Sequence, residues 1–475
     1  MSTRALSIMV GVLFVLILAG NYYYCVINTK TWYTVFVSAT SRAPGSQEKR
    51  LAAYLDRLAQ AAGHADRIAP LKGYCTGLLL PGERKSVEPM AARLAPDNVQ
   101  RLHQSLHHLV AHAPWSDEAL LKTVREYVLP AMQSNGPVVA WIVDDTGFVK
   151  KGTHSVGVAR QYCGPVGKQE NCQVAVSLSI ATQAASLPIA WRLYLPESWA
   201  NDWERRRAAG VPEPIAFQTK PAIALEQIRK AVAEKVALGV VLADAAYGSD
   251  NQFRAGLREL RLRYLLGVQG TMTVWRPGEG PLPKKRWKRK GRPPTRLRRD
   301  AQHQPVSLRQ LAAELPEPAW RTVTWREGTK QELQSRFAAL RVRPAHRDYL
   351  RAEPHPEEWV LIEWPEGESE PTKYWVSNLP TTTTRLKLVS LAKHRWIIER
   401  DYEELKQELG LGHYEGRGWR GFHHHATLCL AAYGFLVAER GRFSPSARAG
   451  GLELRAPRIP ADYQPRGSAR ASRAA

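Results

Sequence analysis

The spacing of apolar residues divides the chain into a helical first part and a later part that mixes strands and helices. Between residues 47 and 135, apolar residues recur at helical intervals, as at Leu51, Leu55 and Leu58, and this spacing is typical of helices that pack on one face. Ser116 stands before two acidic residues and another such run, which is a helix start signal. We therefore expect a small helical domain over residues 47–135.

The period changes near residue 138. Two short apolar runs, residues 138–143 and 238–243, resemble buried strands, and each is followed directly by an aspartate, Asp144 and Asp244. Between the two runs the pattern predicts two more strands and a helix, and after the second run a helix and a strand. This order predicts a mixed α/β core.

Residues 270–384 have a different pattern, with strand-like runs at Phe337–Val342, Glu358–Glu363 and Tyr374–Ser377, and we expect a β-rich insertion here. Helical spacing returns at 388–409 and 423–439, the second segment being apolar on most faces and therefore buried. The predicted divisions are an apolar N-terminal extension (1–46), the helical domain (47–135), the first part of the core (136–269), the insertion (270–384), the second part of the core (385–440) and a disordered tail (441–475).

The first residues do not fit the pattern of the rest. Residues 5–20 are almost wholly apolar and follow Arg4, a stretch that resembles a signal-peptide core or a short membrane anchor. Three interpretations stay open: a start codon assigned too far upstream, a membrane anchor, or a signal peptide. We favour the first, and expect a cytoplasmic protein without a membrane role, because the chain after residue 47 has the pattern of a soluble protein.

Charge indicates the kind of partner. Lysine and arginine number 67 against 44 aspartate and glutamate, a formal net charge of +23, and such an excess favours nucleic acid, since binding to phosphates releases counterions. The stretch 284–299 concentrates this charge, and we interpret it as a phosphate clamp, with a solvated arm as the alternative. The five cysteines match no zinc pattern, so we expect reduced thiols.

The acidic residues suggest a site for metal ions. If Asp144 and Asp244 lie at the tips of adjacent strands, their charges repel unless a cation lies between them, and Mg²⁺ prefers such oxygen ligands. Taken alone, each aspartate is more often a turn or helix cap. In the late helix, Arg395, Glu399 and Lys406 are separated by four and seven residues, which predicts one shared helix face.

These segments carry a specific resemblance. Arg395, Glu399 and Lys406, followed by Gly410-Leu411, resemble the Tyr-Arg-Glu-Lys signature of DDE transposases from bacterial insertion sequences, although Ala392 stands where that signature has Tyr. The chain resembles the IS701-type branch of this family over about residues 48–440. The other blocks that resemble it are 144–158, 244–248, 77–88 and 423–436.

The resemblance implies a fold and a set of site residues. The implied fold is an RNase H-like core, a mixed sheet flanked by helices, with a β-rich insertion and an N-terminal helical domain. The implied catalytic and metal-binding triad is Asp144, Asp244 and Glu399, with Asp145 as the rival for the first place, and it implies two Mg²⁺ ions for which Mn²⁺ can substitute. The expected DNA contacts are Arg395, Lys406, Lys150, Lys151, Lys284, Lys285, Arg286 and Lys288.

The activity implied is cut-and-paste DNA transposition. The resemblance implies metal-dependent cleavage of double-stranded DNA at terminal inverted repeats, then attack of the freed 3′-hydroxyl on target DNA. It also implies a homodimer in the DNA complex and a nucleoid-associated location. The alternatives are a transposase-derived DNA-binding regulator that has lost catalysis, and, from residues 5–37 alone, a membrane-tethered protein.

Overall fold

The computed structural model describes residues 13–18, 21–28, 31–33, 46–327 and 332–443. Within the N-terminal extension it has the strands β1 (Leu13–Leu18), β2 (Asn21–Asn28) and β3 (Thr31–Tyr33), which form a small antiparallel sheet of their own. Of the helices that the structure describes, none combines the length and apolar character needed to cross a membrane. The predicted disordered tail lies outside the described residues from 444 onward.

Five helices make up the segment expected to be helical. They are α1 (Ser46–Ala61), α2 (Ala65–Leu79), α3 (Val87–Leu94), α4 (Val99–Ala111) and α5 (Asp117–Gln133). Ser116 caps α5 as the sequence predicts, because its side chain accepts a hydrogen bond from the Ala119 amide. The apolar pattern did not reveal α2, which contains Pro70 and crosses α3 so closely that a Cβ at Gly77 would lie 3.1 Å from the Met90 sulfur.

The centre of the molecule is a mixed sheet, which confirms the mixed α/β fold expected from the sequence. Its central strands run in the order β7-β6-β4-β8-β9, with β4 antiparallel to β6 and parallel to β8. This order is consistent with an RNase H-like core. The bounds of the strands are β4 (Ala140–Val149), β5 (Ala159–Cys163), β6 (Lys168–Ala181), β7 (Ser186–Leu193), β8 (Val240–Ala243) and β9 (Tyr264–Val268).

Short and medium helices connect these strands. Their bounds are α6 (Glu197–Ala200), α7 (Trp203–Ala208), α8 (Lys220–Ala233), α9 (Ala245–Gly248) and α10 (Asn251–Glu259). The strand β4 is longer than expected: the apolar run was predicted to end at Asp144, but β4 continues to Val149 because β6 pairs with it throughout. What ends near Asp144 is the parallel pairing with β8, whose last pair is Ile142 with Leu242.

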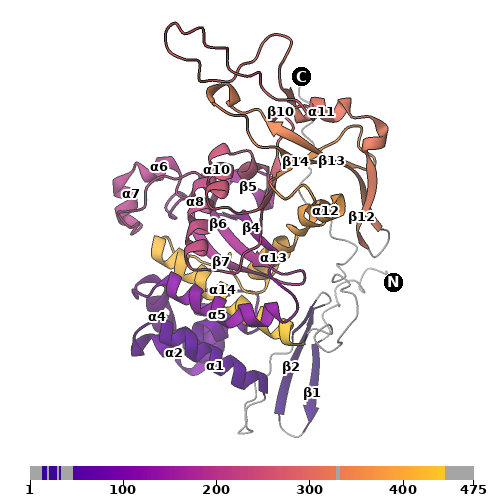
Figure 1. Ribbon diagram of the computed structural model, residues 1–475. Coiled ribbons are helices and arrows are strands. Elements are labelled where there is room, and N and C mark those ends of the chain that lie inside the picture. The colour runs from indigo at the N-terminus through magenta and orange to yellow at the C-terminus, as the bar shows by residue number, and fades with distance from the viewer. Residues whose placement is uncertain (1–12, 19–20, 29–30, 34–45, 328–331, 444–475) are drawn as a thin grey trace, which may run out of the picture.

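The segment expected to be an inserted β-rich part extends the same sheet. The strand of this segment that joins the core is β15, which pairs antiparallel with β9. From β15 the order continues through β14, β13, β10 and β11, and β12 also pairs with β13. The bounds are β10 (Thr273–Trp275), β11 (Val306–Ser307), α11 (Leu308–Glu314), β12 (Arg321–Glu327), β13 (Glu332–Pro344), β14 (Glu358–Pro365) and β15 (Lys373–Ser377). Figure 1 shows these strands at one end of the molecule and α1–α5 at the other.

The last part of the chain holds three helices, α12 (Arg385–His394), α13 (Ile397–Gln407) and α14 (Trp419–Phe443). The sequence predicted a single helix where α12 and α13 lie, and this is wrong: the helical ladder is interrupted at Arg395 and Trp396. The bonds there span three residues instead of four, as from the Glu399 amide to the Trp396 carbonyl. The buried helix α14, which was expected, packs against α5, α2 and α4 and joins the N-terminal helices to the core.

Candidate active site

The two aspartates that follow the apolar runs lie at matching positions on neighbouring parallel strands. Ile142 pairs with Leu242, so Asp144 and Asp244, each two residues further on, occupy the same level of the sheet, where neighbouring strands are about 4.8 Å apart. The backbone of Asp244 leaves the strand here, and its side chain caps α9 by accepting hydrogen bonds from the Ala246 and Tyr247 amides. Asp244 is therefore both a helix cap and a neighbour of Asp144.

Strand alternation separates Asp144 from its rival, Asp145. Successive side chains of a strand point to opposite faces of the sheet, and the contacts follow this rule. Asp144 accepts a hydrogen bond from Arg395 Nη1 at 2.9 Å. On the other face, Asp145 accepts from Lys220 Nζ at 3.2 Å and from the Tyr247 hydroxyl at 3.0 Å. Only Asp144 of this pair therefore faces the α12–α13 junction.

Arg395 connects the three acids expected to act together. Its guanidinium pairs with Asp144 and is also electrostatically coupled to Asp244 and Glu399. Burial opposes its charge, but the carboxylates of Asp144, Asp244 and Glu399 outweigh burial and raise the Arg395 pKa. Arg395 therefore pairs with Asp144, and the charges of Asp244 and Glu399 act on the same guanidinium.

Burial controls the charge of Asp144. It raises the Asp144 pKa to about 7; Arg395 opposes this shift, whereas the neighbouring Asp244 and Asp145 add to it. A carboxyl group whose pKa lies near neutrality changes its charge readily, and a nearby cation favours its ionised form. In this structure the cation is the guanidinium of Arg395.

The carboxylates do not form a ready three-ligand metal site. Asp144 and Asp244 offer oxygen ligands of the type that Mg²⁺ prefers. Within the described residues, however, no group of three or more His, Cys, Asp and Glu side chains is arranged to hold a metal ion. The three carboxylates therefore offer the donor atoms that a metal ion needs, and in this structure Arg395 supplies the positive charge beside Asp144.

Two glycines fix the position of Asp244. The short helix α9 lies directly on β9, and a Cβ at Gly248 would lie only 1.9 Å from the carbonyl oxygen of Gly267. A Cβ at Gly267 would in turn lie 3.0 Å from the Ala245 nitrogen. The close approach that these glycines allow holds α9, and with it the aspartate that caps its start, against the sheet.

Comparison with known proteins decides the family. A family profile described as "DDE superfamily endonuclease" matches residues 57–332, more than half of the chain. The chain belongs to this family. The match confirms the resemblance seen in the sequence motifs; it includes Asp144 and Asp244 and ends before Glu399.

A curated relative points in the same direction. The probable transposase for insertion sequence element IS701 from Microchaete diplosiphon is 32% identical to this DDE endonuclease over 193 residues, which are 40% of the chain and 46% of that protein. The chain therefore spans less than half the length of the transposase that it matches.

Two lysines of the DDE endonuclease that were expected to contact DNA bond instead within the protein. Lys406 Nζ donates to Thr146 Oγ1 at 2.7 Å and to the Gly147 carbonyl at 2.9 Å, so it ties α13 to β4. Lys150 Nζ donates to the Tyr414 carbonyl at 2.7 Å. Burial lowers the pKa of both lysines, that of Lys406 to about 8.

Of the remaining expected DNA contacts, Arg395 pairs with Asp144, and the others are exposed. Lys151 lies on the surface after β4, and Lys284, Lys285, Arg286 and Lys288 lie on the long excursion between β10 and β11. The base of this excursion is fixed, because Leu282 pairs with Arg298, and Arg299 forms an ion pair with the buried Asp348. The charged residues therefore project from an anchored base.

Buried polar residues lie beneath the acids, and the spacing of apolar residues does not predict them. Ser177 is the partner of Asp144 across the β4–β6 ladder, and its hydroxyl lies 2.6 Å from that of Tyr402 on α13. Asp401 is buried and accepts hydrogen bonds from Ser186 and Tyr433. Tyr402 is buried in the manner of a core residue. The sequence feature that indicates these buried contacts is the presence of serines, Ser177 and Ser186, within otherwise apolar strands.

The three consecutive histidines of α14 have structural partners. His423 accepts from the Leu193 amide, His424 stacks on Trp115 with ring centroids 3.7 Å apart, and His425 lies 2.8 Å from the Tyr74 hydroxyl. Burial lowers the pKa of each histidine to about 4. The four cysteines whose side chains the structure describes are free and buried.

Proposed function

We propose that the protein is a DNA transposase that cleaves double-stranded DNA at the ends of an insertion sequence and joins them to target DNA. The single observation that carries this proposal is that Asp144 and Asp244 each lie two residues beyond the last paired residues of the neighbouring parallel strands β4 and β8, in a chain of the DDE endonuclease family. The similarity to a probable transposase of an insertion sequence supports the same activity. The net charge of +23 favours a DNA substrate.

We assign Asp144, Asp244 and Glu399 as the catalytic carboxylates and propose that activity requires a divalent metal, Mg²⁺ or Mn²⁺ in its place. A bound metal would supply positive charge to the phosphoryl group under attack. The coupling of Arg395 to all three acids supports their assignment as one group. The surface lysines and arginines, Lys151, Lys284, Lys285, Arg286 and Lys288, would hold the DNA backbone.

The proposed partners follow from the reaction. Two ends of one element must be cut and joined together, so we propose terminal inverted repeats as the substrate and a homodimer as the active assembly. Because this substrate is genomic DNA, we propose a cytoplasmic, nucleoid-associated location. We also propose that the fold is an RNase H-like core with an inserted β-rich part and an N-terminal DNA-binding domain.

The test is a nicking assay on duplex DNA taken from the flanks of the gene, with Mg²⁺ or Mn²⁺. We expect Asp144→Asn, Asp244→Asn and Glu399→Gln each to lower the cleavage rate about a hundredfold or more, since each removes a carboxylate that would hold the metal whose charge stabilises the transition state. Asp145→Asn is the matched control, because Asp145 faces the opposite side of the same strand.

Two results would contradict the proposal. Loss of cleavage in Asp145→Asn with full cleavage in Asp144→Asn would show that the first aspartate is wrongly assigned. DNA binding without cleavage under any metal would instead favour a regulator without catalysis.

A further inference from the structure

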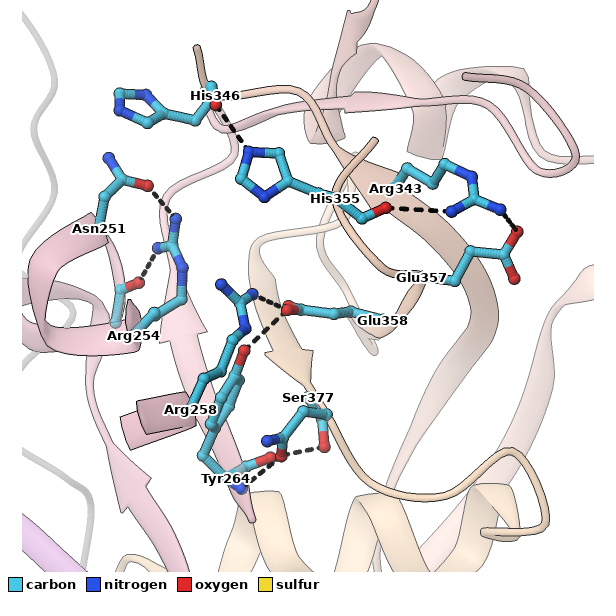
Figure 2. A network of polar contacts seen from close by, with 12 residues as sticks. Asn251, Arg254, Arg258, Tyr264, Arg343, His346, His355, Glu357, Glu358 and Ser377 are labelled. Carbon is cyan, nitrogen blue, oxygen red and sulfur yellow. Dashed lines mark hydrogen bonds and ion pairs between the residues drawn. The ribbon is translucent and has the colours of Figure 1, made fainter. Parts of the chain in front are cut away.

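An arginine-lined cavity lies where the core meets the strands that extend its sheet. It has a volume of about 460 Å³. Its wall includes Arg258 from the end of α10, Arg261 and Arg263 from the turn between α10 and β9, and Arg341 from β13. Glu357 and Glu358 also line it. Figure 2 shows the polar network on one side of this junction, with Arg258 and Tyr264 converging on Glu358.

The two acids of the wall are already neutralised. Glu358 is buried and pairs with Arg258, and it also accepts a hydrogen bond from the Tyr264 hydroxyl at 2.7 Å. Glu357 pairs with Arg343 at 3.1 Å. Among the ion pairs of the described residues, none involves Arg261, Arg263 or Arg341. These three guanidinium groups therefore leave a net positive charge around the cavity.

Arg263 and Arg341 are each held in place by a hydrogen bond, and each retains further N–H groups that can donate to a ligand. Arg263 donates one hydrogen bond to the Asn378 carbonyl at 2.8 Å, and Arg341 donates one to the Glu357 carbonyl at 2.7 Å. Arg341 also lies over the Trp359 ring, 5.3 Å from its centroid. Within the described part of the chain, no acceptor reaches the buried Nε and Nη1 of Arg341. Buried donors without acceptors are costly, so they mark a place for an acceptor from outside.

We propose that this cavity binds a phosphodiester group of the DNA backbone. A guanidinium presents its N–H groups in a planar fork that matches two phosphate oxygens, and Arg261, Arg263 and Arg341 surround the space with such forks. The inference rests on the proposed function, because DNA is the polyanion that this chain would handle. A phosphate held between Arg263 of the core and Arg341 of β13 would also join the two parts of the sheet.

The cavity is remote from the acids. Arg261 and Arg263 precede β9, whereas Asp244 follows the parallel neighbour β8. The cavity and Asp244 therefore lie at opposite ends of these two strands. The five residues of β9 span roughly 17 Å. The bound phosphate therefore belongs to DNA outside the cleavage point, and its loss weakens binding without changing the chemical step.

The experiment measures binding of fluorescent end-sequence duplex at several salt concentrations, in an Asp144→Asn background that prevents cleavage. The variants are Arg263→Gln/Arg341→Gln and Arg261→Gln, the latter an exposed side chain whose change leaves the fold intact. The control is Arg229→Gln, an exposed arginine on α8 outside the cavity. Each lost phosphate contact makes the slope of log K against log[salt] shallower by about 0.9. We expect this change for Arg261→Gln, and about twice this change with about tenfold weaker binding for the double variant.

The outcomes separate this inference from the proposed function. Slopes equal to that of Arg229→Gln in folded variants would overturn the cavity assignment, while the transposase proposal would stand. If inorganic phosphate alone raises the melting temperature through these arginines and the DNA slope does not change, the ligand is free phosphate and the inference fails. If the parent chain binds no DNA, the proposed function fails and this inference fails with it.

Discussion

At the scale of single residues, Arg395 decides how the acids are organised. The sequence signature placed it near Glu399, but only the folded chain brings its guanidinium to Asp144, 251 positions away. The same contact distinguishes Asp144 from Asp145, a choice that a pair of adjacent aspartates leaves open in the sequence. Lys406 had the same predicted role as Arg395, yet it bonds to Thr146 and Gly147 and stabilises the junction of α13 with β4.

Replacing Arg395 tests this arrangement. We expect Arg395→Ala to lower the free energy of unfolding by on the order of 2–3 kcal/mol, somewhat less than the loss of one partner of a fully buried ion pair, because the pair with Asp144 is partly exposed. Arg229→Ala breaks an exposed pair with Glu259 and should cost less than about 1 kcal/mol.

Chemical denaturation with urea measures both variants. Adding Mn²⁺ should recover more stability in Arg395→Ala than in the parent, since the cation replaces the missing positive charge. Equal stability of the two arginine variants would show that Arg395 does not balance the acids.

At the scale of elements, close contacts between backbones position the site. Apolar runs correctly predicted β4, β8 and α14, because burial of whole strands and helices leaves a strong pattern. The break between α12 and α13 was not predictable from spacing, since residues 388–409 have helical periodicity throughout and only the hydrogen bonds at Arg395 and Trp396 reveal the interruption. The contact of α9 with β9 is likewise a property of the fold that the Tyr247-Gly248 motif only suggests.

Gly248→Ala tests whether this contact holds Asp244. The added methyl group would overlap the Gly267 carbonyl oxygen, so α9 must move away from the sheet. We expect a loss of stability of about 3 kcal/mol, at the upper end for overpacking because the obstacle is backbone, together with reduced DNA cleavage.

Thermal melting and the nicking assay provide the measurements. Gly164→Ala is the control, since a Cβ there meets no atom within 4 Å and should change stability by less than about 0.5 kcal/mol. If Gly248→Ala retains the melting temperature and cleavage of the parent, the tight contact of α9 with β9 is not required.

At the scale of the whole molecule, the two main features are the excess of positive charge and the continuous sheet. The excess of lysine and arginine predicted a polyanionic partner, and the mixed α/β core followed from alternating patterns. The sequence did not reveal that the strands of residues 273–377 continue the core sheet, because pairing partners such as β15 and β9 are about a hundred residues apart and leave no local signal. The arginine cavity depends on this pairing and was invisible for the same reason.

Shortening the basic excursion tests its contribution to DNA binding. Leu282 and Arg298 face each other across its base, so residues 284–296 can be replaced by a short glycine-serine turn. We expect more than tenfold weaker binding at moderate salt and a clearly shallower salt dependence, because several phosphate contacts are lost together.

A fluorescence titration measures the effect, with a variant that substitutes residues 284–296 by neutral residues of the same length as the control for length. Both variants should lose affinity equally. Unchanged binding in the neutral variant would show that the excursion is a solvated arm without a role in DNA binding.

The length of the sheet also determines the relative directions of its strands. From β4 to β13 there are five steps between neighbours, and each step in a twisted sheet rotates the strand direction by roughly 20°. The rotation accumulates to about a right angle, so β13 runs across the direction of β4. A straight duplex lying along one set of strands therefore crosses the other, and a nucleic acid that follows both surfaces has to curve.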